Sequence, residues 1–201
     1  MKDTRLIRHS RFILFFGAAF FLLSACAILG SGPTGGDKDV TPPKVLGQNP
    51  ANGTRNFNQK EIVISFDEYF QLDNPQSEII MTPNPGGTPK YNIRGKDMEV
   101  DLKDVKLDSN TTYTINFGES IKDYNEGNVL DTFQYVFSTG NYLDSLKLQG
   151  AASDALTNAA PDKAIAILYK PGQDSAIYKA KPLYYAKVDK DGHFCFRNLP
   201  K

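Results

Sequence analysis

Histidine, cysteine and tryptophan are scarce in this sequence of 201 residues, which contains two, two and none of them. Only His193 lies outside the first 25 residues, so a histidine-based metal cluster or a catalytic triad has at most one contributor. Cys195 is the only thiol left if Cys26 is modified, which excludes an intramolecular disulfide. No glycine-rich loop follows a strand and opens a helix, so nucleotide binding has no support. We expect a protein that is not an enzyme, with no cofactor and no small-molecule substrate.

The chain also lacks an excess of charge of either sign. Lys and Arg together number 23, as do Asp and Glu. Removal of residues 1–25 would leave 19 basic against 22 acidic residues, a net charge near −3. Such a chain has no basic field to attract nucleic acid or an anionic membrane surface. We therefore expect no nucleic-acid partner.

Residues 1–25 have the layout of a secretory signal peptide. Met1–Arg11 carries four basic residues, and the apolar run Phe12–Ala25 that follows ends in small residues. A transmembrane helix is the alternative, but it needs about 20 apolar residues, which the run approaches only by extending to Leu29. A buried core helix is disfavoured by the basic flank and by the glycine-rich stretch that follows. We predict a signal peptide over residues 1–25.

Leu23-Ser24-Ala25-Cys26 resembles the lipobox of bacterial lipoproteins. The resemblance implies cleavage between Ala25 and Cys26 and acylation of Cys26 with palmitate or similar chains, which would anchor the protein to a membrane. Ala27 lacks the acidic character that retains some Gram-negative lipoproteins at the inner membrane. The outer membrane is therefore favoured, with the periplasmic and surface faces both open. Residues 26–40, rich in Gly, Ser, Pro and Thr, should form a flexible tether.

Between residues 41 and 140, short alternations of apolar and polar residues are separated by turn residues. Seven or so strands at this spacing predict an all-β, Ig-like Greek-key β-sandwich. Each strand would bury one face, which a stack of two sheets satisfies. The clearest alternations are Ile62–Phe66, Met98–Leu102, Tyr113–Phe117 and Phe133–Phe137.

A smaller motif, formed by Leu107, Thr111 and Tyr113, precedes one of these strands. It resembles the tyrosine corner of Ig-like and fibronectin-type sandwiches, in which the tyrosine hydroxyl bonds to backbone a few residues upstream. The alternative is that Tyr113 is only an inward-facing aromatic residue. The spacing of the leucine and the threonine favours the corner.

Several motifs follow one another between Asp39 and Thr139, namely Thr41-Pro42-Pro43, Asn49-Pro50-Ala51-Asn52-Gly53, Ile62–Glu68, Asn110–Tyr113, Asp123–Asn128 and Phe137-Ser138-Thr139. In this order they resemble the bacterial Ig-like domain first recognised in S-layer proteins. The resemblance implies a spacer or adhesive module without catalytic residues. A lipobox, a short tether and an Ig-like domain in succession also resemble a group of Gram-negative envelope lipoproteins.

A second β unit is predicted over residues 146–201. An Asp-Gly turn at Asp189–Gly192 should join its last two strands in a hairpin. The unit is similar to the small prealbumin-like domain of carboxypeptidase regulatory regions, which normally continues with another core strand. Since the sequence ends at Lys201, we expect an incomplete domain with an open edge, in an N-terminal part of a longer protein or a truncated product.

No residue pattern predicts a metal site. Asp189–Gly192 resembles the start of a calcium loop, but the later oxygen ligands are missing and a plain turn is favoured. Asp123, Asn125 and Asn128 lie in a second oxygen-rich loop and are a weak calcium candidate. His193 and Cys195 are interpreted as structural residues.

Three functions remain open. The leading hypothesis is a non-enzymatic, lipid-anchored envelope protein whose Ig-like domain is a spacer, scaffold or adhesion module. The second is a glycan- or protein-binding lipoprotein of a surface uptake machine, which an exposed aromatic cluster near Tyr69, Phe70 and Tyr91 would favour. Tyr91, Tyr184 and Tyr185 could stack on sugars, although alternation explains them as sheet residues. The third is the non-catalytic front of a longer envelope enzyme.

Overall fold

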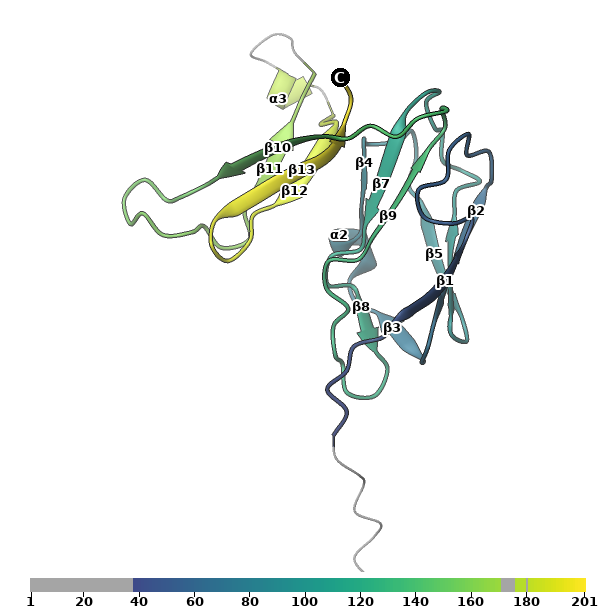
Figure 1. The fold of residues 1–201 in the computed structure, drawn as a ribbon. Helices are drawn as coiled ribbons and strands as arrows, with labels where there is room; N and C mark the ends of the chain where they lie inside the picture. Colours follow the sequence, from purple (N-terminus) through teal and green to yellow (C-terminus); the bar gives the residue numbers. More distant parts are fainter. Residues whose placement is uncertain (1–37, 171–175, 180) are drawn as a thin grey trace, which may run out of the picture. The chain divides into compact units, whose positions relative to one another are not determined.

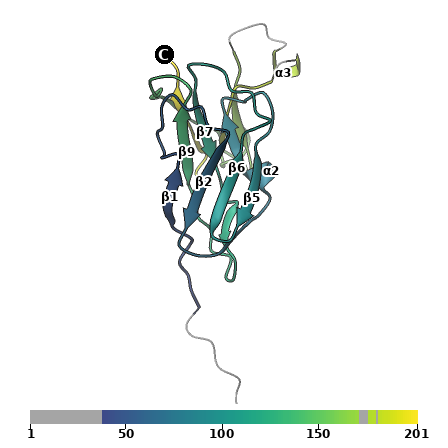
Figure 2. The same ribbon diagram turned by 90° about the vertical axis from the view of Figure 1, so that its right-hand side faces the viewer.

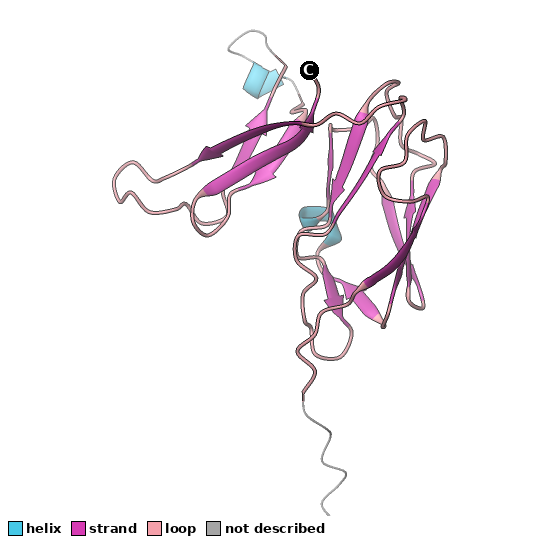
Figure 3. Ribbon diagram, in the orientation of Figure 1, coloured by secondary structure: helices cyan, strands magenta, loops and turns pink. Residues whose placement is uncertain are grey.

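The computed structural model describes residues 38–170, 176–179 and 181–201. Nearly all regular structure in these ranges is β-strand, and α2 (Pro75–Glu78) and α3 (Ala176–Lys179) are helices of four residues each (Figure 3). The predicted all-β fold is confirmed. Neither of these helices is long and apolar enough to cross a membrane. The predicted signal peptide, with Ala25, and the predicted lipidation site Cys26 lie outside the described residues.

Residues 41–140 form a sandwich of antiparallel sheets (Figures 1 and 2). One sheet has four strands in the order β1-β2-β6-β5, the other has three in the order β4-β7-β9, and β3 and β8 form a short ribbon. The strands are β1 (Val45–Asn49), β2 (Glu61–Phe66), β3 (Phe70–Leu72), β4 (Ile80–Thr82), β5 (Lys90–Arg94), β6 (Asp97–Asp101), β7 (Thr112–Asn116), β8 (Ile121–Asp123) and β9 (Gln134–Ser138). The connections β4–β5 and β6–β7 cross from one sheet to the other, as in a Greek-key sandwich.

The alternating strands supply the core. In β2, Ile62, Ile64 and Phe66 are fully buried, and the strand register places Ile62 opposite Val100 and Ile64 opposite Met98 on β6. Burying an apolar side chain of this size contributes about 1.5–3 kcal/mol. The facing sheet adds four buried side chains from β7 and β9, namely Tyr113, Ile115, Tyr135 and Phe137. The alternation in the sequence therefore identified the inward side of both sheets.

β7 departs from the alternation, because its outward side chains are buried as well. Thr112 and Thr114 are both below a tenth exposed. The hydroxyl of Thr112 accepts the backbone N–H of Asp144 at 2.9 Å, and that of Thr114 accepts the side-chain amide of Asn198 at 2.8 Å. Residues that follow the sandwich thus cover the outer face of β7, which the sequence pattern assigned to solvent.

The residues of the tyrosine corner lie together at one end of β7. The Tyr113 hydroxyl accepts a hydrogen bond from the backbone N–H of Asp108, five residues upstream, at 2.8 Å. Leu107 packs against the core, and the Thr111 hydroxyl donates to the Ser109 carbonyl at 2.9 Å. This is the contact that the corner interpretation requires.

The described residues between 146 and 201 form two two-stranded antiparallel sheets. β10 (Leu146–Ala151) pairs with β13 (His193–Leu199), and β11 (Ile165–Leu168) pairs with β12 (Tyr184–Lys187). Among the described strands, β10 and β11 each have a hydrogen-bonded neighbour on one side. Apolar side chains on these two strands, including Leu148 and Ile165, are about half exposed.

The predicted hairpin between the last two strands is wrong. The turn itself is present, because Gly192 has φ +85° and its N–H donates to the Asp189 carbonyl at 3.0 Å. The strands it joins, β12 and β13, belong to different sheets. β13 instead lies beside β10, where Gly150 faces Phe194 and leaves space for its ring. A tight turn determines the local reversal of the chain, but long-range packing selects the partner strand.

Tyr113→Phe should lower the free energy of unfolding by about 1–3 kcal/mol, because it leaves the Asp108 N–H without its acceptor. Urea denaturation measures the change. The matched control is Tyr91→Phe, since the Tyr91 hydroxyl makes no hydrogen bond to a described residue; a change within about 0.5 kcal/mol is expected there. Equal losses in both variants would contradict the role of the corner.

Candidate functional site

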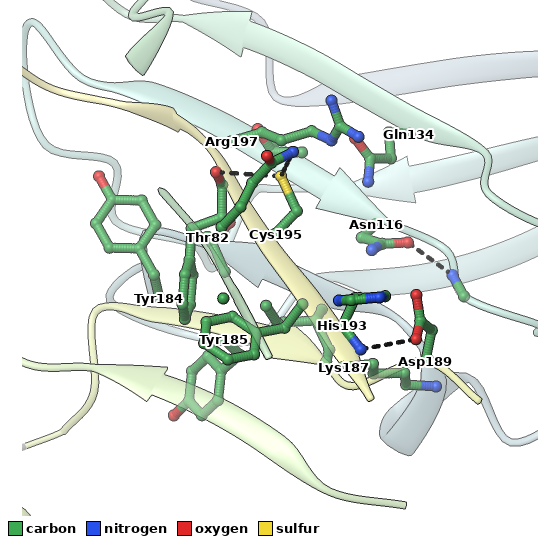
Figure 4. Close-up of a pocket in the computed structure, with 18 of the residues that line it drawn as sticks. Thr82, Asn116, Gln134, Tyr184, Tyr185, Lys187, Asp189, His193, Cys195 and Arg197 are labelled. Carbon is green, nitrogen blue, oxygen red and sulfur yellow. Dashed lines mark hydrogen bonds between the residues drawn. The ribbon is translucent and has the colours of Figure 1, made fainter. Parts of the chain in front are cut away.

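A groove of about 460 Å³ lies between the outer face of the sheet β4-β7-β9 and the strands β12 and β13 (Figure 4). Its volume falls within the range of roughly 300–1,000 Å³ that is typical of small-molecule sites. Hydrogen bonds that join its sides include Asn198 to Thr114, the Asn84 N–H to the Leu183 carbonyl at 2.8 Å, and Lys187 to Glu78. The groove is thus bounded by segments that are distant in sequence.

The first wall presents several uncharged side chains that can form hydrogen bonds, together with Ile80 of β4 and Glu78 of α2. Successive side chains of a strand point to opposite faces, so burying Met81, Ile115 and Tyr135 in the core turns their neighbours outward. The outward residues that line the groove include Thr82, Thr114, Asn116 and Gln134. The Asn116 carbonyl oxygen accepts the Gly118 N–H at 3.0 Å, which orients the amide.

The second wall comes from β12 and β13. Tyr184 and Tyr185 contribute aromatic rings, and burial raises the pKa of the Tyr184 hydroxyl. His193, Cys195 and Arg197 alternate along β13 and therefore lie on one face of the strand (Figure 4). This wall combines aromatic surface with donors and acceptors of hydrogen bonds.

The charges in the groove balance. Lys187 on β12 forms an ion pair with Glu78 of α2, and its hydrogen bond holds the pKa of the Glu78 carboxyl below the usual value, although burial opposes this shift. The remaining charged residues in the lining are Asp189 and Arg197. The formal charges of these two acidic and two basic residues cancel.

His193 and Cys195 lie in the groove, but their contacts are structural. The His193 backbone N–H donates to the Asp189 carboxylate at 2.8 Å and thereby helps to close the turn. The half-buried Cys195 thiol lies 3.7 Å from the Gln149 amide nitrogen and 3.6 Å from the Phe196 carbonyl oxygen. Each hydrogen bond described for the thiol thus involves an amide or a carbonyl.

Asp123, the centre of the calcium candidate, closes its own loop. One carboxylate oxygen accepts the Asn125 N–H at 2.7 Å, and the other accepts the Glu126 N–H at 3.1 Å and lies 3.3 Å from the Asn128 amide. The hydrogen bond from the Asn125 N–H is the main cause of the lowered pKa of Asp123, and burial opposes it. The Asn128 amide also donates to the Asp39 carbonyl at 3.0 Å. The loop therefore fastens the N-terminal end of the sandwich.

Metal binding has no further support in the described ranges. Within them, no three or more His, Cys, Asp or Glu side chains are grouped so that they could hold a metal ion. The oxygens of Asp123 already serve backbone donors. Asp123, Asn125 and Asn128 stay a weak candidate for calcium binding that the fold does not require.

An exposed aromatic cluster near Tyr69, Phe70 and Tyr91 would favour a binding lipoprotein over a spacer, but these three residues do not form one. Tyr69 is 62% exposed, whereas Phe70 is buried and packs on Phe66 with 4.4 Å between ring centroids. Tyr91 is half-buried against Phe117. The aromatic surface with neighbouring polar groups lies instead in the groove.

The sequence interpretation missed the polar residues of the groove. It considered Tyr184 and Tyr185 as residues that could stack on sugars, but not Asn116, Gln134 or Arg197. Their only signal was an outward position in an alternating strand, which many solvent-exposed residues share. The packing of residues 184–199 beside the sandwich makes them neighbours.

The family described as a bacterial Ig-like domain matches residues 39–139, half of the chain. No curated protein matches the chain. Among solved structures, it is similar to an L,D-transpeptidase from Mycobacterium smegmatis, with 12% sequence identity over 73% of this chain and 76% of that one, and a TM-score of 0.31. A likeness at that TM-score supports no inference about function.

Gly150→Ala should destabilise the pairing of β10 with β13. A methyl group at this position would meet atoms of the Phe194 ring at 2.4–3.0 Å, so the ring must move. Overpacking of this kind costs about 1–3 kcal/mol. Hydrogen exchange of the β10 and β13 amides measures the loss. Gly47→Ala is the control, because nothing lies within 4 Å of its added methyl group. If the β10 and β13 amides were equally protected from exchange in both variants, the packing of Phe194 on Gly150 would be contradicted.

The lowered pKa of Asp123 predicts a loss of stability in acid. The stability from its ionised form is present above the usual pKa of an aspartate and is lost as pH falls through the lowered pKa of the folded state. Urea midpoints between pH 7 and pH 3 should show wild type losing its advantage over Asp123→Asn. Glu126 has a raised pKa, chiefly through its hydrogen bond with Asp123, so its contribution has the opposite sign. A pH-independent difference between wild type and Asp123→Asn would refute the argument.

Proposed function

Since this chain belongs to the bacterial Ig-like domain family, we propose that it is a non-enzymatic, lipid-anchored protein of the outer membrane of a Gram-negative bacterium. Its sandwich would act as a spacer and scaffold that holds the second β unit away from the membrane. Domains of this family are typically non-catalytic structural or binding modules of extracellular or envelope proteins. The lipid anchor at Cys26, the tether and the outer-membrane location are the specific elements of the proposal.

One observation carries the spacer role: the chain enters the sandwich at one end and leaves it at the other (Figures 1 and 2). At the first end, Asn128 donates to the carbonyls of Asp39 and Thr41 at 3.0 and 3.2 Å. At the far end, the Thr139 hydroxyl donates to the Asp108 carbonyl at 2.7 Å. The termini of many domains lie close together. Separated termini add the length of the domain to the distance between an anchor and whatever follows.

The core makes this spacer stiff. Phe137 lies at its centre, with ring centroids of Phe57, Tyr113 and Tyr135 at 4.2, 5.5 and 6.1 Å. Aromatic pairs of this kind contribute about 0.5–1.5 kcal/mol each beyond the burial of their area. A domain packed in this way transmits its length rather than bending, which suits a scaffold.

The anchor follows from the lipobox resemblance. Each methylene group of an acyl chain buried in a bilayer contributes about 0.8 kcal/mol, and stable anchoring takes more than one chain. Several chains on Cys26 would meet that requirement without a transmembrane helix. This supports a protein that is held at the membrane surface while its folded part stays in water.

Cys26→Ser should abolish incorporation of labelled palmitate and move the protein out of the detergent-soluble membrane fraction. The matched control is Cys195→Ser, which removes the other cysteine and should leave labelling unchanged. Labelling is measured by metabolic incorporation and fractionation by density-gradient separation of the membranes. Undiminished labelling of Cys26→Ser, or sedimentation of the labelled protein with the inner membrane, would overturn the proposed anchoring.

A further inference from the structure

We propose that the groove between β4-β7-β9 and β12–β13 binds an uncharged oligosaccharide. This inference names a ligand class for the envelope module proposed above. It rests on that proposal only in one respect: a protein of the envelope is within reach of envelope glycans. Four features of the groove support this proposal: walls made of strand faces, a set of planar polar groups, aromatic rings and the absence of net charge.

The walls present the faces of strands, so side chains supply most of the contacts to a ligand. On the first wall, the backbone of β7 is already paired with both β4 and β9. On the second, β13 is paired with β10 and β12 with β11, each along one edge among the described strands. A peptide that binds by strand addition would use such an unpaired edge, which lies at the rim of a sheet and not on its face. The side-chain groups on the strand faces favour a ligand with many hydroxyl groups, and a peptide is the alternative that the test includes.

The polar groups suit pairs of sugar hydroxyls. A hydroxyl group both donates and accepts a hydrogen bond, and amides present both functions in one plane. Asn116 and Gln134 provide two amides on one wall, and Gln149 provides a third on the other side. The Gly118 N–H bonds to the Asn116 carbonyl oxygen and so orients this amide before a ligand arrives. Arg197 adds a planar donor from β13.

Aromatic rings supply the apolar contact that a sugar needs. The face of a pyranose ring carries C–H groups, which pack on aromatic surface. Tyr184 and Tyr185 both line the groove and are half-buried. They are successive residues of β12 and so project to opposite faces of the strand, which gives the groove two separate aromatic contacts and not one continuous surface. Tyrosine is well suited to this role, since it combines a large apolar face with a hydroxyl group.

The balance of charge in the groove disfavours an acidic polymer. Glu78 and Lys187 neutralise one another, and Asp189 offsets Arg197. An acidic polymer would need a positive field that the groove does not have. Burying a charged ligand without a counter-charge is costly, whereas an uncharged glycan exchanges hydrogen bonds with water for similar bonds with the protein.

The test is calorimetric titration of the full chain, purified in a detergent without a sugar headgroup. The probes are hexasaccharides of glucose, xylose and N-acetylglucosamine in α and β linkages. Wild type should bind at least one of them saturably. Gln134→Ala and Tyr185→Ala should each weaken that binding roughly three- to tenfold. Matched controls outside the groove are Gln59→Ala and Tyr69→Ala, two exposed residues of the sandwich, which should bind as wild type does.

Absence of binding to every hexasaccharide would overturn the inference, as would equal affinity in the groove variants and wild type. Tighter binding of an acidic polysaccharide or a peptide than of any neutral glycan would also overturn it. Circular dichroism melting checks that each variant is folded. Should Tyr185→Ala unfold, Gln134→Ala decides the question, because its side chain points away from the core. The anchor is tested separately by palmitate labelling, so failure of one proposal leaves the other intact.

Discussion

β7 is the strand on which the rest of the structure depends, because it is buried on both faces. Its inner side chains, Tyr113 and Ile115, belong to the core, and its outer Thr112 and Thr114 are covered by residues that follow the sandwich. A strand buried on both sides must satisfy all of its backbone groups within the sheet. β7 does so by pairing with β4 on one edge and β9 on the other. The corner, the core and the groove all meet on these five residues.

The two sides of β7 account for the two proposed roles of the protein. Inward, aromatic and aliphatic packing gives a stiff domain whose ends are separated, as a spacer requires. Outward, the same strand presents Thr114 and Asn116 to the groove, beside Gln134 of β9. A rigid sheet is a good support for a binding site, since side chains on packed strands are held in place more firmly than those on loops. A spacer and a binding surface can therefore share one sheet.

Several charged groups in the groove have roles within the fold. Glu78 and Lys187 form an ion pair, and the Asp189 carboxylate accepts the His193 N–H and closes a turn. Catalytic sites tend to leave acids and bases poised toward a substrate, with pKa values shifted by several units. Recognition through neutral donors, acceptors and rings fits a module of a family that is typically non-catalytic.

The sequence by itself determined the all-β class, the inward side of β2, β7 and β9, and the turn at Asp189–Gly192. These features follow from local rules: alternation of side chains along a strand, and the positive φ that glycine permits at Gly192. Only the tertiary structure decided that β13 pairs with β10 rather than β12, that the outer face of β7 is covered, and that Asn116 and Gln134 lie opposite Tyr184 and Tyr185. Each of these is a contact between residues far apart in the chain. Such contacts depend on how whole surfaces pack, and no local pattern of residue types records which surfaces will meet.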